Sequence, residues 1–351
     1  MNHRKNILVA PLNWGLGHAS RCIPVIEALE RHGFTPIIAS DGASLQFLKN
    51  EFPQLTALEL PSYDIQYPKK GSHFKWKLLW NSPKQLKAIR DEKKRVAQWV
   101  SDYQLCGIIS DNRLGVRNNK VPSVIITHQL EVLSGRSTWA STAIHHYFIA
   151  KFTECWVPDV ASVPNLSGRL GHLLQNKFPV KYMGVLSRMQ RKELIPQYQL
   201  LVLLSGPEPQ RTLLEEKLIA ELQNSELKTL FVRGMITDQQ SLAPIGAITF
   251  CNYMQREALE QAFNESEMVL SRSGYTTVMD VSVLQKKVFF IPTPGQYEQE
   301  YLARHYKELK IANSSAQKDF KLQDVFDTAE QYQGFSRLEG ENPWEALFRL
   351  F

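Results

Sequence analysis

The first 190 residues alternate between short apolar runs and longer stretches in which apolar residues recur every three or four positions. The apolar runs predict β-strands, and the amphipathic stretches predict α-helices. The expected strands are Ile7–Pro11, Thr35–Ser40, Leu55–Leu60, Gly107–Ser110, Val121–Thr127 and Glu154–Val157, and the expected helices are Ala19–Arg31, Pro83–Val100 and Thr138–Ile149. Short apolar strands that alternate with helices are typical of a parallel sheet with helices on both faces.

The same alternation starts again near residue 199. Its expected strands are Leu200–Leu204, Thr229–Val232, Met268–Leu270 and Val288–Ile291, and its expected helices are Thr212–Leu222, Arg256–Asn264, Thr276–Leu284 and Glu298–Leu309. The segment from Gly184 to Pro196 lacks strong periodicity, which indicates a hinge. We therefore predict an α/β chain with two doubly wound, Rossmann-like domains at residues 1–190 and 191–335. The amphipathic end of residues 336–351 predicts a helix that packs back on the first domain.

Composition narrows the class of protein. The chain has 351 residues, 43% of them hydrophobic, which suits two globular domains with sizeable cores. No apolar run approaches the roughly 18 residues that a membrane-spanning helix needs. The four cysteines are far apart and form no Cys-x-x-Cys pair, so we expect reduced thiols in a cytoplasmic protein.

Charge divides the two halves of the chain. Residues 1–190 carry 24 Lys and Arg against 13 Asp and Glu, a net charge of +11, whereas the remainder has a net charge of −5. A cationic half is expected to meet a membrane surface, a phosphate-bearing acceptor or nucleic acid. Nucleic acid is the least favoured of the three, because the sequence has no recognition motif and no aromatic platform.

The first expected strand leads into a glycine-containing loop that ends at Gly17 and His18, just before a helix. Glycine lets a backbone approach a ligand, and the N-terminus of a helix disfavours a protonated imidazole. We therefore expect His18 to be a neutral imidazole that can accept a proton. The same loop is compatible with dinucleotide binding, with Asp41 at the end of the second strand as the ribose-binding acid.

The second domain contains a similar junction after the strand Met268–Leu270. The loop holds Ser271, Arg272, Ser273 and Gly274, and the following helix contains Asp280. Amides at the helix start are suited to bind a diphosphate, Arg272 to orient it, and Asp280 to accept hydrogen bonds from a ribose diol. A polar loop at 292–300 follows the next strand, at the edge where open α/β sheets bind ligands.

These motifs resemble glycosyltransferase family 28. Gly15–His18 is similar to the family's first glycine-rich loop, which ends in Gly-His. Ser271, Arg272 and Gly274, followed by Asp280, match its Ser-Arg-x-Gly and acidic helix residue, and Gln299-Glu300 is similar to a Gln pair near the donor sugar. The resemblance implies the GT-B fold, in which two Rossmann-like domains face each other across a cleft, one for the acceptor and one for the nucleotide sugar.

Several residues depart from the family pattern. The acid on the helix is usually Glu, and Asp280 has a shorter reach; Glu300 replaces the second Gln. The family's Gly-Gly-Ser-x-Gly loop is replaced by residues 204–209, where Ser205 and Gly206 are followed by prolines that lack N–H groups. His128 and the residues after it match an acceptor-side His-Glu-Gln-Asn only in part. The peptidoglycan acceptor of the family's best-known member is therefore not carried over.

The resemblance implies inverting transfer of a hexose or N-acetylhexosamine from a nucleotide sugar, for which a UDP-sugar is the expectation. His18 is the first candidate for the base, and Asp111 and His128 are further candidates on the acceptor side because both follow strand ends. Gly17 and Arg188 join the residues expected near the donor diphosphate. The sequence has no Asp-x-Asp, so we expect neither a metal nor a cofactor beyond the nucleotide sugar.

Three alternatives stay open, namely a nucleotide-sugar epimerase of the same fold, an NAD(P)-dependent oxidoreductase that uses the first glycine loop, and a non-catalytic binder. The aromatic and basic segment Phe74–Trp80 precedes a helix with a basic outer face. This pattern suits peripheral contact with the anionic inner face of the membrane and a lipid-linked acceptor, or else an ordinary amphipathic helix packed on the sheet.

Overall fold

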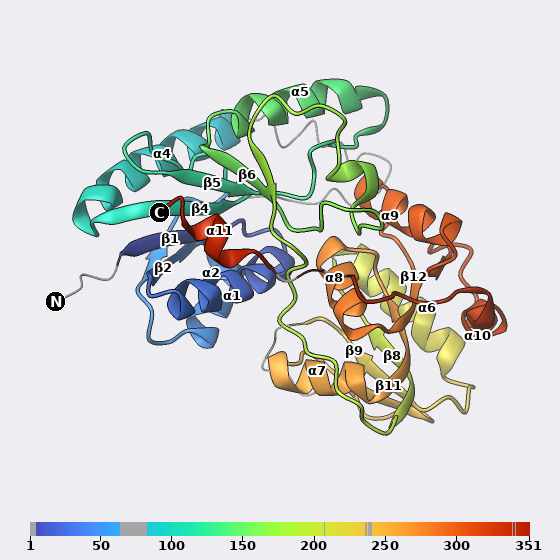
Figure 1. Ribbon diagram of the computed structural model, residues 1–351. Helices are drawn as coiled ribbons and strands as arrows, with labels where there is room; N and C mark the ends of the chain where they lie inside the picture. The colour runs from blue at the N-terminus through green and yellow to red at the C-terminus, as the bar shows by residue number, and fades with distance from the viewer. Residues whose placement is uncertain are drawn as a thin grey trace. The chain divides into compact units, whose positions relative to one another are not determined.

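The computed structural model describes residues 5–63, 83–206, 208–235, 237, 241–338, 340 and 342–351 (Figure 1). These residues form two compact units. The first contains the described residues up to Arg188 together with the C-terminal segment from residue 340, and the second contains those from Met189 to Leu338. The division between the units falls within the 184–196 segment.

The first unit is built on a seven-stranded parallel sheet with the order β3-β2-β1-β4-β5-β6-β7. Its strands are β1 (Asn6–Pro11), β2 (Thr35–Ser40), β3 (Ala57–Glu59), β4 (Leu105–Asp111), β5 (Ser123–Ile126), β6 (Glu154–Val157) and β7 (Val180–Tyr182). Its helices are α1 (Leu16–Arg31), α2 (Gly42–Glu51), α4 (Pro83–Asp102) and α5 (Thr138–Ile149), with a C-terminal turn of helix, α11 (Trp344–Phe348). In Figure 1, α4 and α5 lie on one side of this sheet, and α1 and α2 lie on the other.

Alternate residues of each strand explain why both faces are covered. Leu8 and Ile108, from β1 and β4, pack with Val96 of α4 in one apolar cluster. Ile7 and Val9 of β1 point to the opposite face and are also fully buried. A parallel strand that is apolar on both faces needs helices on both sides to remove it from water.

The C-terminal segment completes the first unit. The ring of Phe351 lies 6.0 Å from that of Trp156 in β6, and Phe348 packs edge-on against Phe34. Gly107 of β4 is needed beneath this segment, because a Cβ there would lie 2.2 Å from the Phe351 ring. Asn342 donates from Nδ2 to two backbone carbonyls of the first unit. These contacts hold the last residues of the chain on the first unit's sheet.

The second unit has a six-stranded parallel sheet with the order β10-β9-β8-β11-β12-β13. Its strands are β8 (Tyr198–Leu203), β9 (Thr229–Val232), β10 (Ile248–Cys251), β11 (Ser266–Ser271), β12 (Lys287–Phe290) and β13 (Asn313–Ser314). Its helices are α6 (Gln210–Leu222), α7 (Arg256–Asn264), α8 (Tyr275–Leu284), α9 (Tyr297–Glu308) and α10 (Gln323–Asp327). Leu200, Val202, Phe231 and Leu270 form part of one apolar cluster with Leu218 of α6.

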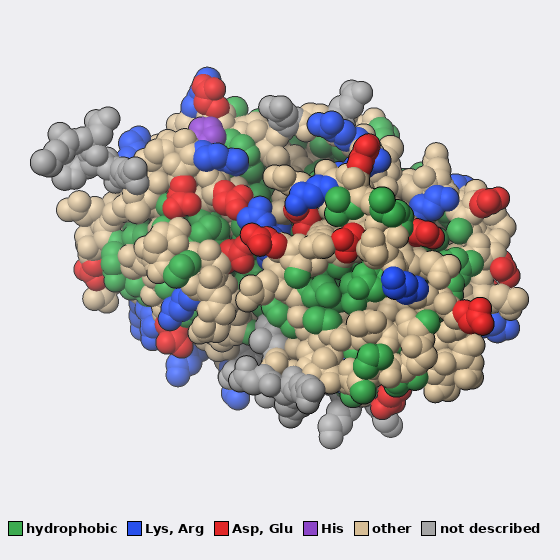
Figure 2. Space-filling model, turned by 90° about the horizontal axis from the view of Figure 1, so that it is seen from below, with side chains coloured by type: hydrophobic (Ala, Val, Ile, Leu, Met, Phe, Trp, Pro, Cys, Tyr) green, Lys and Arg blue, Asp and Glu red, His purple; other side chains and the backbone are tan. Residues whose placement is uncertain are grey.

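The predicted fold class, two doubly wound α/β units with parallel sheets, is confirmed. The sequence did not predict α2 or the short strands β7, β10 and β13, and the expected strand Leu55–Leu60 is reduced to Ala57–Glu59 at the sheet edge. None of the described helices combines the length and apolarity that crossing a bilayer requires. On the face shown in Figure 2, basic and acidic side chains are interspersed.

Candidate functional site

Each sheet has one position where the strand order reverses. In the first unit it lies between β1 and β4, and in the second it lies between β8 and β11. The connections after these two strands leave in opposite directions, and open α/β sheets commonly bind ligands at the carboxyl ends of the strands at such a position. The predicted site residues gather at these two positions, and each group is described within its own unit.

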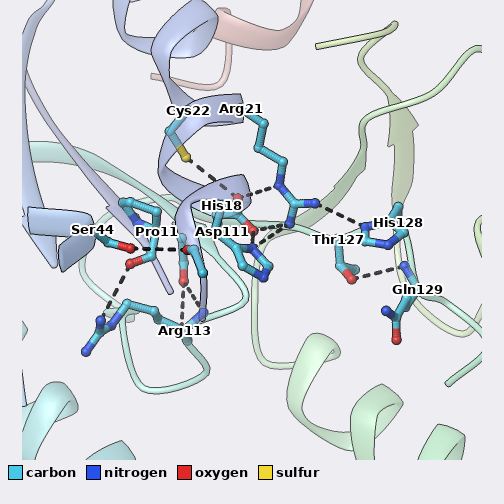
Figure 3. A network of polar contacts seen from close by, with 12 residues as sticks. Pro11, His18, Arg21, Cys22, Ser44, Asp111, Arg113, Thr127, His128 and Gln129 are labelled. Atoms are coloured by element: carbon cyan, nitrogen blue, oxygen red, sulfur yellow. Dashed lines mark hydrogen bonds and ion pairs between the residues drawn. The ribbon is translucent and has the colours of Figure 1, made fainter. Parts of the chain in front are cut away.

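In the first unit, three predicted residues meet at the reversal point (Figure 3). His18 lies in the first turn of α1, Asp111 is the last residue of β4, and His128 lies two residues beyond β5. Because β1, β4 and β5 are adjacent and parallel, the loops that follow them share one edge of the sheet. The structure thus brings the three candidate proton-transfer groups together.

A residue that the sequence analysis missed, Arg21 of α1, connects these groups. Its Nε donates to Asp111 Oδ2 over 2.6 Å, and its Nη2 donates to Asp111 Oδ1. The Nδ1 atom of His18 lies 3.0 Å from Asp111 Oδ1 and 2.9 Å from Arg21 Nη2. The Nδ1 atom of His128 lies 3.1 Å from Arg21 Nη1. Arg21 follows His18 by three residues, a spacing that places both side chains on one face of a helix. This spacing was the feature of the sequence that could have indicated Arg21 as a neighbour of His18.

Burial and charge set the protonation of this network. Burial alone would raise the pKa of Asp111, but Arg21 and then His18 outweigh it and hold the pKa well below its usual value. Burial lowers the pKa of His18, and Arg21 lowers it further, against the opposing effect of Asp111. Asp111 is therefore a carboxylate beside a neutral His18 imidazole. The side chain of His18 is 13% exposed and that of Asp111 is 0% exposed, so a ligand can reach the imidazole.

A second buried network lies beside the first and fixes Asp41. Its Oδ1 accepts a hydrogen bond of 2.6 Å from Arg113, and its Oδ2 accepts one of 3.0 Å from Asn13. Arg113 is fully buried and also pairs with Glu92 over 2.7 Å. Since Asp41 is only 5% exposed and both its oxygens are engaged, it is poorly placed to bind a ribose.

In the second unit, the predicted Ser271–Gly274 loop joins β11 to α8. Gly274 precedes the helix, no side chain caps the helix, and a Cβ at Gly274 would have no heavy atom within 4 Å. Ser273 donates to the carbonyl of Gln299 over 2.8 Å, which joins this loop to the start of α9. An uncapped helix start beside open space is suited to bind an anion such as a phosphate.

The guanidinium of Arg272 is turned to neutral groups of the protein. It is 1% exposed, and its guanidinium donates to the carbonyls of Ile291, Pro292 and Gln210 and to the side chain of Gln317, over 2.8–3.2 Å. The arginine thereby holds the loops after β11 and β12 to the start of α6. Burial lowers its pKa. Its position differs from the orienting role that the sequence suggested.

The remaining predicted donor residues lie around the same edge of the second sheet. Ser205 and Gly206 are exposed after β8, and Gly206 has a φ of +104°, which favours glycine. Asp280 lies in the second turn of α8 and is 8% exposed. Gln299 accepts a hydrogen bond from the Thr293 amide, and Glu300 accepts one from the Gly295 amide, both over 2.8 Å.

Two other residues predicted near the diphosphate belong to the first unit. Gly17 is the second residue of α1. Arg188 is the last residue of the first unit before the chain enters the second unit; it is 7% exposed, with its guanidinium 5.3 Å from the centre of the Phe47 ring. Within the described ranges, no cluster of three or more His, Cys, Asp or Glu side chains is arranged to hold a metal ion.

Comparison with known protein families gives a match to part of the second unit. Residues 210–333 match the model of the glycosyltransferase family 28 C-terminal domain. A search of curated protein sequences gave no significant match.

Solved structures match almost the whole chain. MurG of Acinetobacter baumannii is 14% identical with a TM-score of 0.58, and the match covers 99% of both chains. The spinosyn forosaminyltransferase SpnP is 12% identical with a TM-score of 0.61, over 94% of this chain and 92% of that one. Phytolacca americana UGT2, complexed with UDP-2-fluoro-glucose and pterostilbene, is 13% identical with a TM-score of 0.65, over 100% and 94%. At these identities the likeness establishes the fold.

Proposed function

We propose that this chain, a glycosyltransferase of the family 28, GT-B type, transfers a hexose or N-acetylhexosamine from a nucleoside diphosphate sugar to an acceptor hydroxyl. The expected donor is a UDP-sugar, and transfer is expected to invert the anomeric centre without a metal ion. The observation that carries the proposal is the pair formed by the partly exposed His18 and the buried Asp111 at the reversal point of the first sheet.

In this proposal His18 is the base. Its neutral imidazole takes the proton of the acceptor hydroxyl while that oxygen forms a bond to the anomeric carbon. The bond from this carbon to the diphosphate breaks at the same time, and its electron pair leaves with the nucleoside diphosphate. Asp111 stabilises the imidazolium that forms, from 3.0 Å away at Nδ1. His128 lies on the same edge of the sheet and is proposed to line the acceptor side.

The second unit is proposed to bind the donor. The start of α8, with Ser271, Ser273 and Gly274, would hold the diphosphate by its dipole and backbone amides. The exposed Ser205 and Gly206 after β8 are proposed as further phosphate contacts of this unit. Gly17 and Arg188, which belong to the first unit, stay predictions from the sequence. Asp280 would accept hydrogen bonds from the ribose, and Gln299 and Glu300 would contact the sugar. Arg272 supports the loop through its carbonyl contacts.

The buried Asp41 weighs against the oxidoreductase alternative, because both its carboxylate oxygens are already engaged. The products of the reaction distinguish a transferase from an epimerase of the same fold, since the epimerase interconverts nucleotide sugars without releasing a nucleoside diphosphate. Release of UDP in step with glycosylated acceptor would support transfer.

The acceptor is proposed to be lipid-linked and to be met at the cytoplasmic face of an anionic membrane. Helix α4 buries Ala88 and Val96 against the sheet. Its outer face exposes Lys84, Lys87, Arg90, Lys93, Lys94 and Arg95. The segment Phe74–Trp80 lies outside the described residues. Each basic residue near such a surface contributes about 1 kcal/mol of attraction, so co-sedimentation with phosphatidylglycerol vesicles, and not with phosphatidylcholine vesicles, is the expected result.

The first test is a thermal-shift titration of the full chain with UDP- and dTDP-sugars, the free nucleotides and NAD(P)H. Saturable stabilisation by one nucleotide diphosphate and its sugar is expected, because a ligand that binds only the folded state raises the melting temperature. Stabilisation by NAD(P)H alone would refute the proposal in favour of the oxidoreductase.

A further inference from the structure

Arg21 lies at the centre of the first-unit network, although neither the family motifs nor the proposed reaction assigns it a role. The residue is 2% exposed. Its guanidinium pairs with Asp111 through two nitrogens and also faces the Nδ1 atoms of two imidazoles, His18 at 2.9 Å and His128 at 3.1 Å. Figure 3 shows these contacts converging on one guanidinium.

The chemistry of the guanidinium restricts what the imidazoles can do. Arginine has five N–H donors and no acceptor, so it bonds to an imidazole nitrogen only where that nitrogen has a lone pair. A neutral His18 that accepts from Arg21 at Nδ1 must therefore hold its proton on Nε2. A His18 that donates from Nδ1 to Asp111 must hold its proton on Nδ1, and then an N–H of Arg21 faces an N–H of the ring. The two contacts of Nδ1 thus compete.

We propose that Arg21 is a positioning residue that selects the resting state of His18, namely a neutral imidazole with its proton on Nε2. This inference rests on the proposed function for its catalytic meaning. The proton must move from Nε2 to Nδ1, the atom that faces Asp111, before Nε2 can accept the proton of an acceptor hydroxyl. Arg21 therefore sets the cost of forming the base.

The groups around His18 give the direction of the effect. They come from three elements, Arg21 from α1, Asp111 from the end of β4 and His128 from beyond β5, and the thiol of Cys22 contacts Asp111 at 3.7 Å. With Arg21 removed, Asp111 is the charged group that remains beside His18, and a carboxylate at 3.0 Å favours the imidazolium. Loss of the guanidinium should therefore raise the proton affinity of His18 and transfer its proton to Nδ1.

NMR of the full chain tests this without any assay of transfer. Histidine ring signals are followed from pH 4 to 9 in the native chain and in Arg21→Met, and His18→Asn assigns the signal. In the native chain the ¹⁵N shifts should show the Nε2–H form. In Arg21→Met they should show the Nδ1–H form, with a titration midpoint about one unit higher, which is a tenfold gain in proton affinity. The internal control is His172, which lies 3.2 Å from Asp159. Its ring signals should be the same in the native chain and in Arg21→Met.

An Nδ1–H form in the native chain, or an unchanged form and midpoint in Arg21→Met, would overturn the inference. If Arg21→Met does not fold, Arg21→Lys decides. Its ammonium retains the charge beside Asp111 but lacks the planar fork that bridges two partners. The Nδ1–H form is expected there, and the Nε2–H form would overturn the inference. The proposed function fails by a different result, namely full transfer activity in His18→Asn.

Discussion

The reversal points of the two sheets have the same backbone architecture and different chemistry. In the first unit the carboxyl edge of the sheet carries titratable side chains at this position, with the His18 imidazole beside the buried Asp111 carboxylate. In the second unit the edge presents the uncapped start of α8 beside Gly274. Proton transfer needs a group whose protonation can change, whereas diphosphate binding needs fixed dipoles. The difference supports a division of labour between the units.

The buried arginines sharpen this contrast. Arg21 is paired with the carboxylate of Asp111 and faces two imidazoles, so its charge acts on groups that titrate. Arg272 donates to backbone carbonyls and a Gln side chain, which are neutral, so its contacts fix the backbone. Both arginines are buried, so burial alone does not distinguish an arginine that acts on titratable groups from one that fixes the backbone. The chemistry of the groups that each arginine contacts makes this distinction.

The largest effect expected from this contrast is on turnover. His18→Asn should lower kcat/KM by about 10³-fold, within the range that a general base contributes. It should leave the dissociation constant for the nucleotide diphosphate unchanged, because the donor is proposed to be held by the second unit. Stopped assays of UDP release and calorimetric titration measure the two quantities. His172→Asn, a change of the same kind in another His–Asp pair of the first unit, is the control and should retain activity.

The next effect is on stability. Asp111→Asn removes the carboxylate that neutralises the buried Arg21, and an unpaired buried charge costs about 3 kcal/mol of unfolding free energy. The loss should also depend on pH. Since the pKa of Asp111 is depressed in the folded chain, its stabilising contribution is complete well above the unfolded pKa near 3.9 and is lost progressively as pH falls from there through the lower folded pKa. Urea unfolding at about pH 7 and at about pH 2.5 measures the difference. A gap between native chain and variant that does not shrink at the lower pH would contradict the assignment.

The periodic parts of the fold were predictable from sequence, and the polar network only in part. Apolar strands such as Ile7–Pro11 and helices such as Thr138–Ile149 have a burial pattern that is visible along the chain. Helix α2 (Gly42–Glu51) was missed because few of its side chains are buried, and β10 because four residues with one exposed position carry little pattern. Contacts at a strand edge depend on tertiary structure, which local periodicity does not encode.

Individual arginines illustrate the same limit. Arg272 was assigned to the donor diphosphate from its motif, but its side chain is turned to the carbonyls of Ile291 and Pro292. Arg21 was passed over as one polar position in an amphipathic helix, although it is buried and pairs with Asp111. A motif gives the position of a residue in the chain. The direction of its side chain follows from strand order and packing, which bring together residues 90 positions apart.

A smaller effect would localise the donor site to the second unit. Asp280→Asn should weaken UDP binding about tenfold, the loss expected for hydrogen bonds between a charged acceptor and a ribose diol. Calorimetry with UDP measures this loss. Asp324→Asn, on α10 of the same unit, is the control. Normal UDP affinity in Asp280→Asn would remove this residue from the ribose site.

The smallest expected effect tests which of two roles Arg272 has, support of the loop or direct contact with the diphosphate. Arg272→Lys retains a positive charge but cannot reproduce the hydrogen bonds to the carbonyls of Gln210, Ile291 and Pro292. If Arg272 supports the loop, the Arg272→Lys variant should lose about 1 kcal/mol of unfolding free energy, and its UDP affinity should fall by no more than about threefold. A residue that contacts the diphosphate directly would give the reverse, full stability with a tenfold weaker affinity. Urea unfolding and UDP calorimetry on the same sample separate the two outcomes, and only the first agrees with a diphosphate held by backbone amides at the start of α8.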